Sequence, residues 1–457
     1  MASFLDRERT VAGPGFNRWL VPPAALCVHL SIGQAYAFSV FNLPMTRLLG
    51  GTTPSPDDWS LAELGWIFSI AIVFLGIASA IFGSWLDRVG PRRAMFTAAC
   101  CFGGGFLVSA VGVALHQLWI IYLGYGVLGG CGLGIGYISP VKTLMSWFPD
   151  RPGMATGLAI MGFGGGALIA SPLSVMLMQA LGTAGHPGVA PTFVVLGVLY
   201  FSFMIFGATI VRVPPAGWLP AGMVAAPRPG VAANAGDLDP DQALRTPQFY
   251  LLWWVLCLNV TAGIGVLGQA SAMSQEMFHG RISATAAAGF VGLLSLFNMV
   301  GRFFWASTSD LIGRRATYTI FFLLGIALYA VVPSTAQAGS VVLFVLCYGV
   351  ILSMYGGGFA TIPAYLRDVF GLQYVGAIHG RLLTAWSAAG IFGPVLVNYI
   401  RAYEIAHGVA RADSYTITMY LMAGLLLIGL ICNLLVRPLR APAAVGLPTL
   451  SLEEKPQ

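Results

Sequence analysis

Long apolar runs, separated by short polar segments, follow one another along almost the whole chain. A transmembrane helix needs about 20 mostly apolar residues, whereas the strands of a membrane barrel show short alternating segments. The runs here are long and continuous, so we expect an all-α polytopic membrane protein with about twelve transmembrane helices. The predicted helices are 19–42, 62–84, 94–114, 118–147, 152–180, 191–212, 248–274, 284–308, 316–333, 340–366, 372–400 and 415–437.

One segment interrupts the series after the sixth run. It is rich in Pro, Gly and Ala and carries Asp237, Asp239 and Asp241. We interpret it as a linker between two six-helix halves. The predicted organisation is a tail at 1–18, an N-terminal half at 19–212, the linker at 213–247, a C-terminal half at 248–437 and a second tail at 438–457.

The composition excludes several other classes of protein. Hydrophobic residues make up 57% of the 457 residues and charged residues 9%, whereas a soluble protein carries about 25% charged residues. The seven cysteines lie in apolar runs without a CxxC pair, so we expect no disulfide framework and no metal site. The Gly runs 129–136 and 162–166 lie inside predicted helices and precede no Lys-Ser/Thr pair, so they indicate close helix packing, not nucleotide binding. No cofactor is expected.

The distribution of positive charge predicts the orientation. If the N-terminus is cytoplasmic, most of the 23 lysines and arginines fall in cytoplasmic segments, as the positive-inside rule requires. The C-terminus is then cytoplasmic as well. The same distribution explains the net charge of +6 without a nucleic-acid partner.

The two predicted halves carry an internal repeat. Asp87-x-x-Gly90 and Asp310-x-x-Gly313 are separated by 223 residues, and a basic pair follows each glycine. The same offset relates Tyr125-Gly126-Val127 to Tyr348-Gly349-Val350, and Gly157 to Gly380. Parallel six-helix repeats with a substrate site between them, near the bilayer midplane, are typical of secondary transporters of the major facilitator type.

Several motifs carry a closer resemblance. The segment Gly83–Arg93 resembles the loop 2–3 signature of the major facilitator superfamily. The segments Tyr36–Phe41, Trp147–Arg151 and Thr246–Trp253 resemble the oxalate/formate antiporter family, which neighbours the monocarboxylate transporters. The resemblance covers the chain except the tails and the linker. It implies the major facilitator fold with pseudo-symmetric halves and a bacterial inner (plasma) membrane location. We expect the carrier to be monomeric.

The signature implies a cytoplasmic gate. Its Asp lies near a helix end, its Gly allows a tight turn, and its Arg residues offer charge pairing. We therefore expect a latch around two aspartates and their basic neighbours. These residues are Asp87, Arg88, Arg92, Asp310 and Arg314.

Ionisable residues inside membrane helices are the first candidates for function. No carboxylate lies in the middle of a predicted helix, but Arg302 lies within 284–308, one helical turn after Asn298. An unpaired arginine there costs about 2.5–3.5 kcal/mol on insertion scales, and a substrate carboxylate would offset this cost through a bidentate pair. The resembled family places its carboxylate-binding arginine at this position. The alternative is that Arg302 pairs near Asp310 as part of the inner gate.

Aromatic residues at comparable depth are further candidates for the site. Tyr355 and Phe359 lie four residues apart beside three glycines, and Tyr137, Phe163 and Tyr36 lie in the other half. Core packing is the alternative for each of them. A proton, if one is carried, has two candidate residues, His29 and Glu276.

The substrate class follows from a comparison within the resembled family. Oxalate carriers place a Lys where this chain has Trp386. One cation suits one carboxylate, so we expect a small monocarboxylate such as lactate or pyruvate, and we interpret Arg381 as structural. Proton symport and oxalate/formate-type anion exchange both remain open. A membrane-embedded enzyme or a transporter-like receptor is disfavoured, because no catalytic constellation and no folded signalling extension is visible.

Overall fold

The computed structural model describes residues 4–49, 55–183, 185–220, 222–223, 237–278 and 281–439. Within these ranges twelve helical spans are long and apolar enough to cross a membrane, and each overlaps one predicted run. Two isolated β-bridges occur in the described ranges, but no strand. The prediction of an all-α, twelve-span membrane protein is confirmed. Parts of the predicted linker and of the C-terminal tail lie outside the described residues.

The spans are built from the following helices. The first span contains α1 (Val21–Ile32), the 3₁₀ segment η3 (Gly33–Phe41) and α2 (Asn42–Met45). The next five contain α3 (Leu61–Val89), α4 (Pro91–Ala114), α5 (Leu118–Ile121) with the π-helical η4 (Tyr122–Gly129) and α6 (Gly130–Trp147), α7 (Pro152–Leu181) and α8 (Val189–Ile210). The others contain α10 (Pro247–Met277), α11 (Ala284–Ile312), α12 (Arg314–Gln337), α13 (Val341–Phe370), α14 (Val375–Leu382) with α15 (Thr384–Ala406), and α16 (Thr416–Leu435). The short α9 (Pro240–Leu244) precedes α10.

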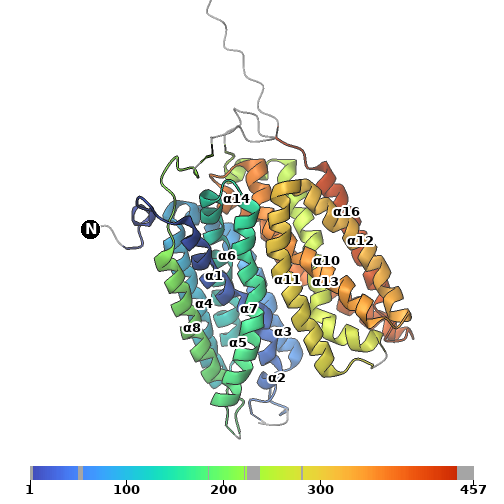
Figure 1. The fold of residues 1–457 in the computed structure, drawn as a ribbon. Coiled ribbons are helices and arrows are strands. Elements are labelled where there is room, and N and C mark those ends of the chain that lie inside the picture. Colours follow the sequence, from blue (N-terminus) through green and yellow to red (C-terminus); the bar gives the residue numbers. More distant parts are fainter. Residues whose placement is uncertain are drawn as a thin grey trace, which may run out of the picture.

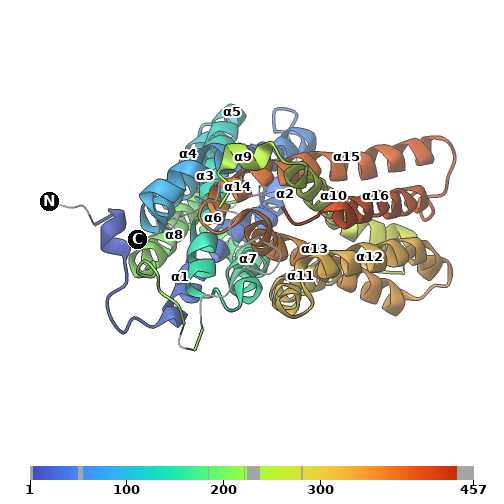
Figure 2. The ribbon, with the colours of Figure 1, turned by 90° about the horizontal axis from the view of Figure 1, so that it is seen from above.

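The helices form two groups that stand side by side (Figure 1). Helices α1 and α3–α8 make up one group, and α10–α13 with α15 and α16 make up the other, as the view from above also shows (Figure 2). The groups meet where α7 packs against α11 and where α14 and α15 pack against α3. We call the end of the bundle at which the N-terminal tail lies the tail end.

Two glycines end equivalent helices at the tail end. Gly90 follows α3 with a φ of 85°, and Gly313 follows α11 with a φ of 88°. This left-handed backbone is accessible to glycine at little cost. Because the two positions are 223 residues apart, the internal repeat seen in the sequence is reproduced in the backbone.

Two further glycines allow the groups to approach each other closely. A Cβ atom on Gly157 would lie 2.9 Å from the carbonyl oxygen of Arg302, and one on Gly380 would lie 2.1 Å from that of Ser79. Gly157 and Gly380 are repeat equivalents, and so are Ser79 and Arg302. The α7–α11 and α14–α3 contacts are therefore two copies of one small-residue helix contact.

Candidate functional site

Arg302 lies near the middle of the bundle. It is ten residues from the end of α11, or about 15 Å from the tail end at 1.5 Å per residue, which is half of a hydrocarbon core about 30 Å thick. The side chain is fully buried. Its Nε donates a hydrogen bond to Asn298 Oδ1 at 2.9 Å, and its Nη1 donates to the carbonyl of Ile160 at 3.5 Å. Nη2 has no hydrogen-bond partner among the described residues.

The alternative in which Arg302 belongs to the gate finds no support in these contacts. Asp310 instead binds Arg314 and the start of α7. Asn298 orients the guanidinium from its own helix, as the spacing of four residues predicts. The close approach of α13 fits this arrangement, since a Cβ on Gly356 would lie 2.6 Å from Asn298 Oδ1.

Aromatic rings surround the Arg302 guanidinium. Its Cζ atom lies 5.6 Å from the ring centre of Phe163 and 5.2 Å from that of Phe359. The Trp386 ring contacts both rings, at centroid distances of 5.3 and 4.5 Å. Phe163 and Trp386 are repeat equivalents, so the two groups contribute matching walls. These distances fit aromatic and cation–π packing.

Three tyrosines complete the set. The Tyr137 ring lies 5.4 Å from that of Trp386, and the Tyr36 ring lies 5.0 Å from that of Phe163. The hydroxyls of Tyr36 and Tyr355 are hydrogen-bonded at 3.0 Å, across the two groups. The structure thus brings together all the aromatic candidates. We call this set the central cluster: Tyr36, Tyr137, Phe163, Tyr355, Phe359 and Trp386.

Polar atoms of the central cluster are buried without partners. Besides Arg302 Nη2, the hydroxyl of Tyr137 and Nε1 of Trp386 lack hydrogen-bond partners in the described part of the chain. Buried polar groups are normally hydrogen-bonded, and an unsatisfied one costs about 1–3 kcal/mol. Each of these groups can donate. A small anion with several oxygen acceptors matches this set of donors.

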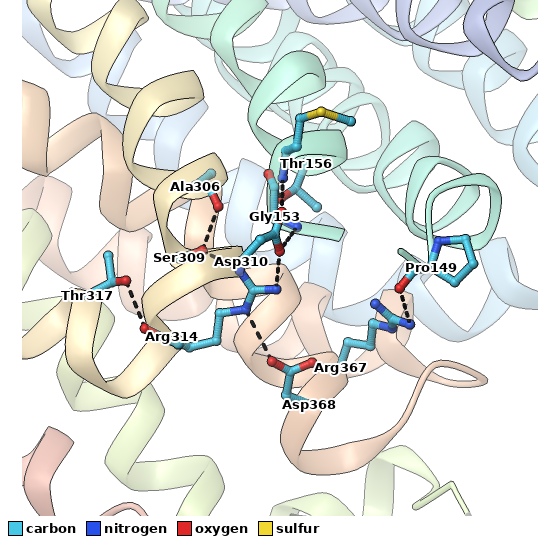
Figure 3. A network of polar contacts seen from close by, with 12 residues as sticks. Pro149, Gly153, Thr156, Ala306, Ser309, Asp310, Arg314, Thr317, Arg367 and Asp368 are labelled. Carbon is cyan, nitrogen blue, oxygen red and sulfur yellow. Dashed lines mark hydrogen bonds and ion pairs between the residues drawn. The ribbon is translucent and has the colours of Figure 1, made fainter. Parts of the chain in front are cut away.

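The two aspartates of the repeat cross between the groups at the tail end. Asp310, at the end of α11, accepts hydrogen bonds from the backbone N–H of Gly153 at 2.9 Å and of Met154 at 2.8 Å, in the first turn of α7. Arg314 Nη2 pairs with the same carboxylate at 2.5 Å (Figure 3). A carboxylate at a helix N-terminus is favourable because it faces the positive end of the helix dipole.

Asp87, at the end of α3, makes the equivalent contact. It accepts the backbone N–H of Ala377 in α14 at 3.2 Å and pairs with Lys142 at 2.7 Å. Lys142 also donates to the carbonyl of Gln373, just before α14. We call these two contact sets the Asp87 latch and the Asp310 latch. Lys142 was not among the gate residues predicted from the sequence.

The arginines of the first signature segment do not cross between the groups. Arg88 is exposed, and Arg92 is buried, where it donates to the carbonyls of Ala208 at 3.2 Å and Phe4 at 2.9 Å. Arg92 therefore attaches α4 to α8 and to the N-terminal tail. The partner of Asp87 is Lys142 because α6 lies next to α3 at this end.

The remaining candidates separate clearly. Glu276 accepts hydrogen bonds from Arg401 and from Tyr415 Oη, the latter at 2.7 Å, at the end of the bundle opposite the tails. Arg381 pairs with Asp241 of the short α9 at 2.7 Å. His29 is buried 5.6 Å from the Tyr137 ring. Of the two proton candidates, His29 alone adjoins the central cluster.

One residue of this region was not identified from the sequence. His379 in α14 is buried, and its ring centre lies 5.9 Å from that of Tyr137. Its Nε2 has no hydrogen-bond partner among the residues that the structure describes. The available signal was a histidine within a predicted span, the same signal that marked His29.

Comparison with known proteins defines the family. The family model described as Major Facilitator Superfamily matches residues 24–394. The chain belongs to the major facilitator superfamily. Its relatives are transporters and its fold is that of transporters of this superfamily. This member is therefore a multi-pass membrane transporter and not an enzyme.

Two relatives indicate its place within the superfamily. The oxalate:formate antiporter of Oxalobacter formigenes is 29% identical over 381 residues, which cover 82% of this chain and 83% of the antiporter. The apicoplast pyruvate carrier 1 of Toxoplasma gondii is 25% identical over 392 residues, covering 74% of this chain and 69% of the carrier. The resemblance to the oxalate/formate antiporter family is confirmed at this low identity.

A solved structure agrees in fold. FucP, the fucose:proton symporter of Escherichia coli, superposes in its outward conformation with a TM-score of 0.64 at 13% identity. The alignment covers 91% of this chain and 99% of FucP.

Proposed function

We propose that this superfamily member is a secondary carrier of small monocarboxylates, such as lactate or pyruvate, and that Arg302 binds their carboxylate. The observation that carries the proposal is a fully buried guanidinium between the two helix groups, held by Asn298 and with Nη2 unpartnered among the described residues. The names of two relatives, an oxalate:formate antiporter and a pyruvate carrier, support small carboxylates as the substrate class.

In this proposal each group around Arg302 has a role. Asn298 occupies Nε and fixes the plane of the guanidinium, so that Nη2 can donate to a carboxylate oxygen. Tyr137 Oη and Trp386 Nε1 supply further donors for the carboxylate or for a neighbouring hydroxyl or keto oxygen. The rings of Phe163 and Phe359 bound the substrate's carbon chain and limit its length.

Charge favours one carboxylate over two. Arg302 supplies one cation to the centre, and its repeat equivalent in the other group is the neutral Ser79. Trp386, where oxalate carriers have a Lys, packs against the two rings that flank Arg302. The second candidate function is an oxalate/formate-type anion exchanger, which the 29% identity to that antiporter favours.

The two latches suggest how access alternates. We assign the tail end to the cytoplasm on the positive-inside distribution of charge, and the carrier to a bacterial inner membrane on its resemblance to the oxalate/formate antiporter family. The Asp87 and Asp310 latches hold the groups together at this end. Their release would let the groups rock about the central cluster and expose it to the cytoplasm. We expect the carrier to be monomeric and to couple the substrate to protons.

A binding measurement on purified protein tests this proposal. A ligand that binds the folded state raises its stability by RT ln(1 + [L]/Kd), about 2.7 kcal/mol at 100 times Kd. Lactate and pyruvate should raise the melting temperature of the wild type and of the control variant Arg381→Lys. Arg381 is a suitable control because it pairs with the exposed Asp241. Arg302→Lys should show no such rise. Equal stabilisation of Arg302→Lys, or stabilisation of the wild type by oxalate alone, would contradict it.

A further inference from the structure

The side chains of His29, Tyr137 and His379 lie next to one another beside the Arg302 guanidinium. We call these three residues the His–Tyr–His group. The Tyr137 ring lies 5.6 Å from that of His29 and 5.9 Å from that of His379. All three side chains are buried to at least 99%. They come from α1, α6 and α14, so the His–Tyr–His group spans the contact between the two helix groups. Helix α14 is also the helix that the Asp87 latch holds.

Each member has an unsatisfied polar atom facing the protein interior. Nε2 of His29, Nε2 of His379 and the hydroxyl of Tyr137 lack hydrogen-bond partners in the described ranges. Nδ1 of His29 lies 3.2 Å from the carbonyl of Ala25, which places the ring proton on Nδ1 and leaves Nε2 as an acceptor. A neutral imidazole with a free Nε2 lone pair is a proton acceptor.

Few charged or titratable side chains surround the His–Tyr–His group. From α11, Arg302 acts electrostatically on His29 and Tyr137. From η3 and α13, Tyr36 and Tyr355 face the same centre and bond each other. Two of the residues packed against the histidine-bearing segments carry no charge: Gly162 of α7 lies under the His29 Cβ, and Ser79 of α3 lies against Gly380.

Two carboxylates contact α14, and both are paired: Asp241 pairs with Arg381 at 2.7 Å, and Asp87 pairs with Lys142. Asp87 accepts the N–H of Ala377, two residues before His379, but its charge is balanced by Lys142 at 2.7 Å. An imidazolium at His29 would therefore lie close to the Arg302 cation, whereas both carboxylates that contact α14 already have a paired cation. Like charges repel strongly in a medium of low dielectric constant.

We propose that His29, Tyr137 and His379 bind the transported proton, and that a carboxylate on Arg302 is what allows them to hold it. The carboxylate neutralises the guanidinium, so the imidazolium then faces no net positive neighbour. Proton and anion thus bind with positive coupling, and by reciprocity each favours the other. The inference rests on the proposed function, because it needs a carboxylate at Arg302.

The proton step balances without any further reagent. On the side that faces water, hydronium gives its proton to the Nε2 lone pair of His29. An N–H bond forms and a water molecule is left. When the carboxylate departs on the other side, the repulsion from Arg302 returns. The N–H bond then breaks and water takes the proton. The Tyr137 ring adjoins both imidazoles, and its hydroxyl, which can both donate and accept, has no other hydrogen-bond partner in the described ranges.

Two transport assays in proteoliposomes distinguish proton coupling from the movement of lactate itself. The proteins are the wild type, the double variant His29→Gln/His379→Gln and the control His407→Gln, whose ring is exposed at the end opposite the tails. One assay measures the accumulation of labelled lactate driven by a proton gradient. The other measures exchange of labelled for unlabelled lactate without a gradient. The wild type and the control should show both, whereas the double variant should lose accumulation at least tenfold and retain measurable exchange.

The outcomes are distinguishable. Full gradient-driven accumulation by the double variant would overturn the proton site, and so would a wild type that exchanges lactate but ignores the gradient. In both cases the carrier proposal would stand. A wild type that neither binds nor exchanges any short monocarboxylate would instead overturn the proposed function.

A measurement on the unmodified protein covers the case in which the double variant does not fold. Ring-¹⁵N signals of labelled histidines distinguish neutral from charged imidazole. Adding lactate at constant pH should convert at least one neutral imidazole of the wild type to the charged form. The spectrum of Arg302→Lys should not change. Unchanged histidine spectra of the wild type at saturating lactate would overturn the inference.

Discussion

At the scale of single residues, a charge within an apolar run was the sequence feature that predicted the candidate site. Arg302 was identifiable because a cation within an apolar run needs an explanation, and the structure places it fully buried with Asn298 on its Nε. The surrounding aromatic residues were identifiable only by their depth along each helix. His379 and Lys142 were not assigned, because spacing along one helix does not show which side chains of other helices they meet.

Trp386 tests the charge argument. Replacing it with Lys should shift selectivity from lactate toward oxalate, by roughly tenfold or more, because a second cation would stand beside the rings that flank Arg302. The matched control is Trp386→Phe, which keeps an aromatic ring and adds no charge. Competition of unlabelled oxalate against labelled lactate measures the effect. An unchanged selectivity ratio in Trp386→Lys would refute the charge argument.

Asn298 tests the orientation of the guanidinium. Asn298→Asp places a fixed carboxylate at the atom that now accepts from Nε at 2.9 Å. The variant should bind lactate roughly 10- to 100-fold more weakly, since hydrogen bonds to charged groups contribute about 1.5–3 kcal/mol and the substrate would then compete with a resident anion. Titration calorimetry of the purified variant measures this change, with Asn433→Asp, on α16, as the control. Wild-type affinity in Asn298→Asp would show that Arg302 does not bind the substrate anion.

At the scale of helices, the spans were predictable and their interruptions were not. Apolar length set the spans, because every backbone polar group in a bilayer must be satisfied internally. The 3₁₀ segment η3, the π-helical η4 and the break at Leu383 could not be predicted, because hydropathy reports the length of an apolar run and not its backbone geometry. These interruptions matter for the site, since η3 carries Tyr36 and the break precedes Trp386 by three residues.

The Asp310 latch provides a test at the same scale. Asp310→Asn removes the ion pair with Arg314 and weakens the contact with the first turn of α7, at a cost of about 1–3 kcal/mol to the closed tail end. Spin labels at the exposed positions Arg88 and Leu311, one on each helix group, should report longer distances in this variant.

The matched control for the latch is Asp150→Asn. Asp150 pairs with Arg18 within the first helix group, so its loss should leave the spin-label distance unchanged. If Asp310→Asn gave the same distance distribution as the wild type, the contact would not hold the tail end closed.

At the scale of the whole molecule, a duplicated frame carries an asymmetric site. The latches, the two glycine contacts and the Phe163–Trp386 pair all follow the 223-residue repeat, whereas Arg302 is matched by Ser79. In the proposed mechanism, the two symmetric groups rock against each other, and the cation of Arg302 is what would make the centre prefer an anion. The frame could be predicted from hydropathy and repeats. The assembly of the central cluster required the packing of both groups.

Uptake of labelled lactate into proteoliposomes tests the central claim, that Arg302 binds the substrate carboxylate, most directly. Wild-type protein and Arg381→Lys should transport lactate at similar rates. Arg302→Lys should reduce the rate at least tenfold at equal protein incorporation, because an ammonium lacks the planar fork that Asn298 orients. A rate for Arg302→Lys equal to that of the wild type would contradict the account.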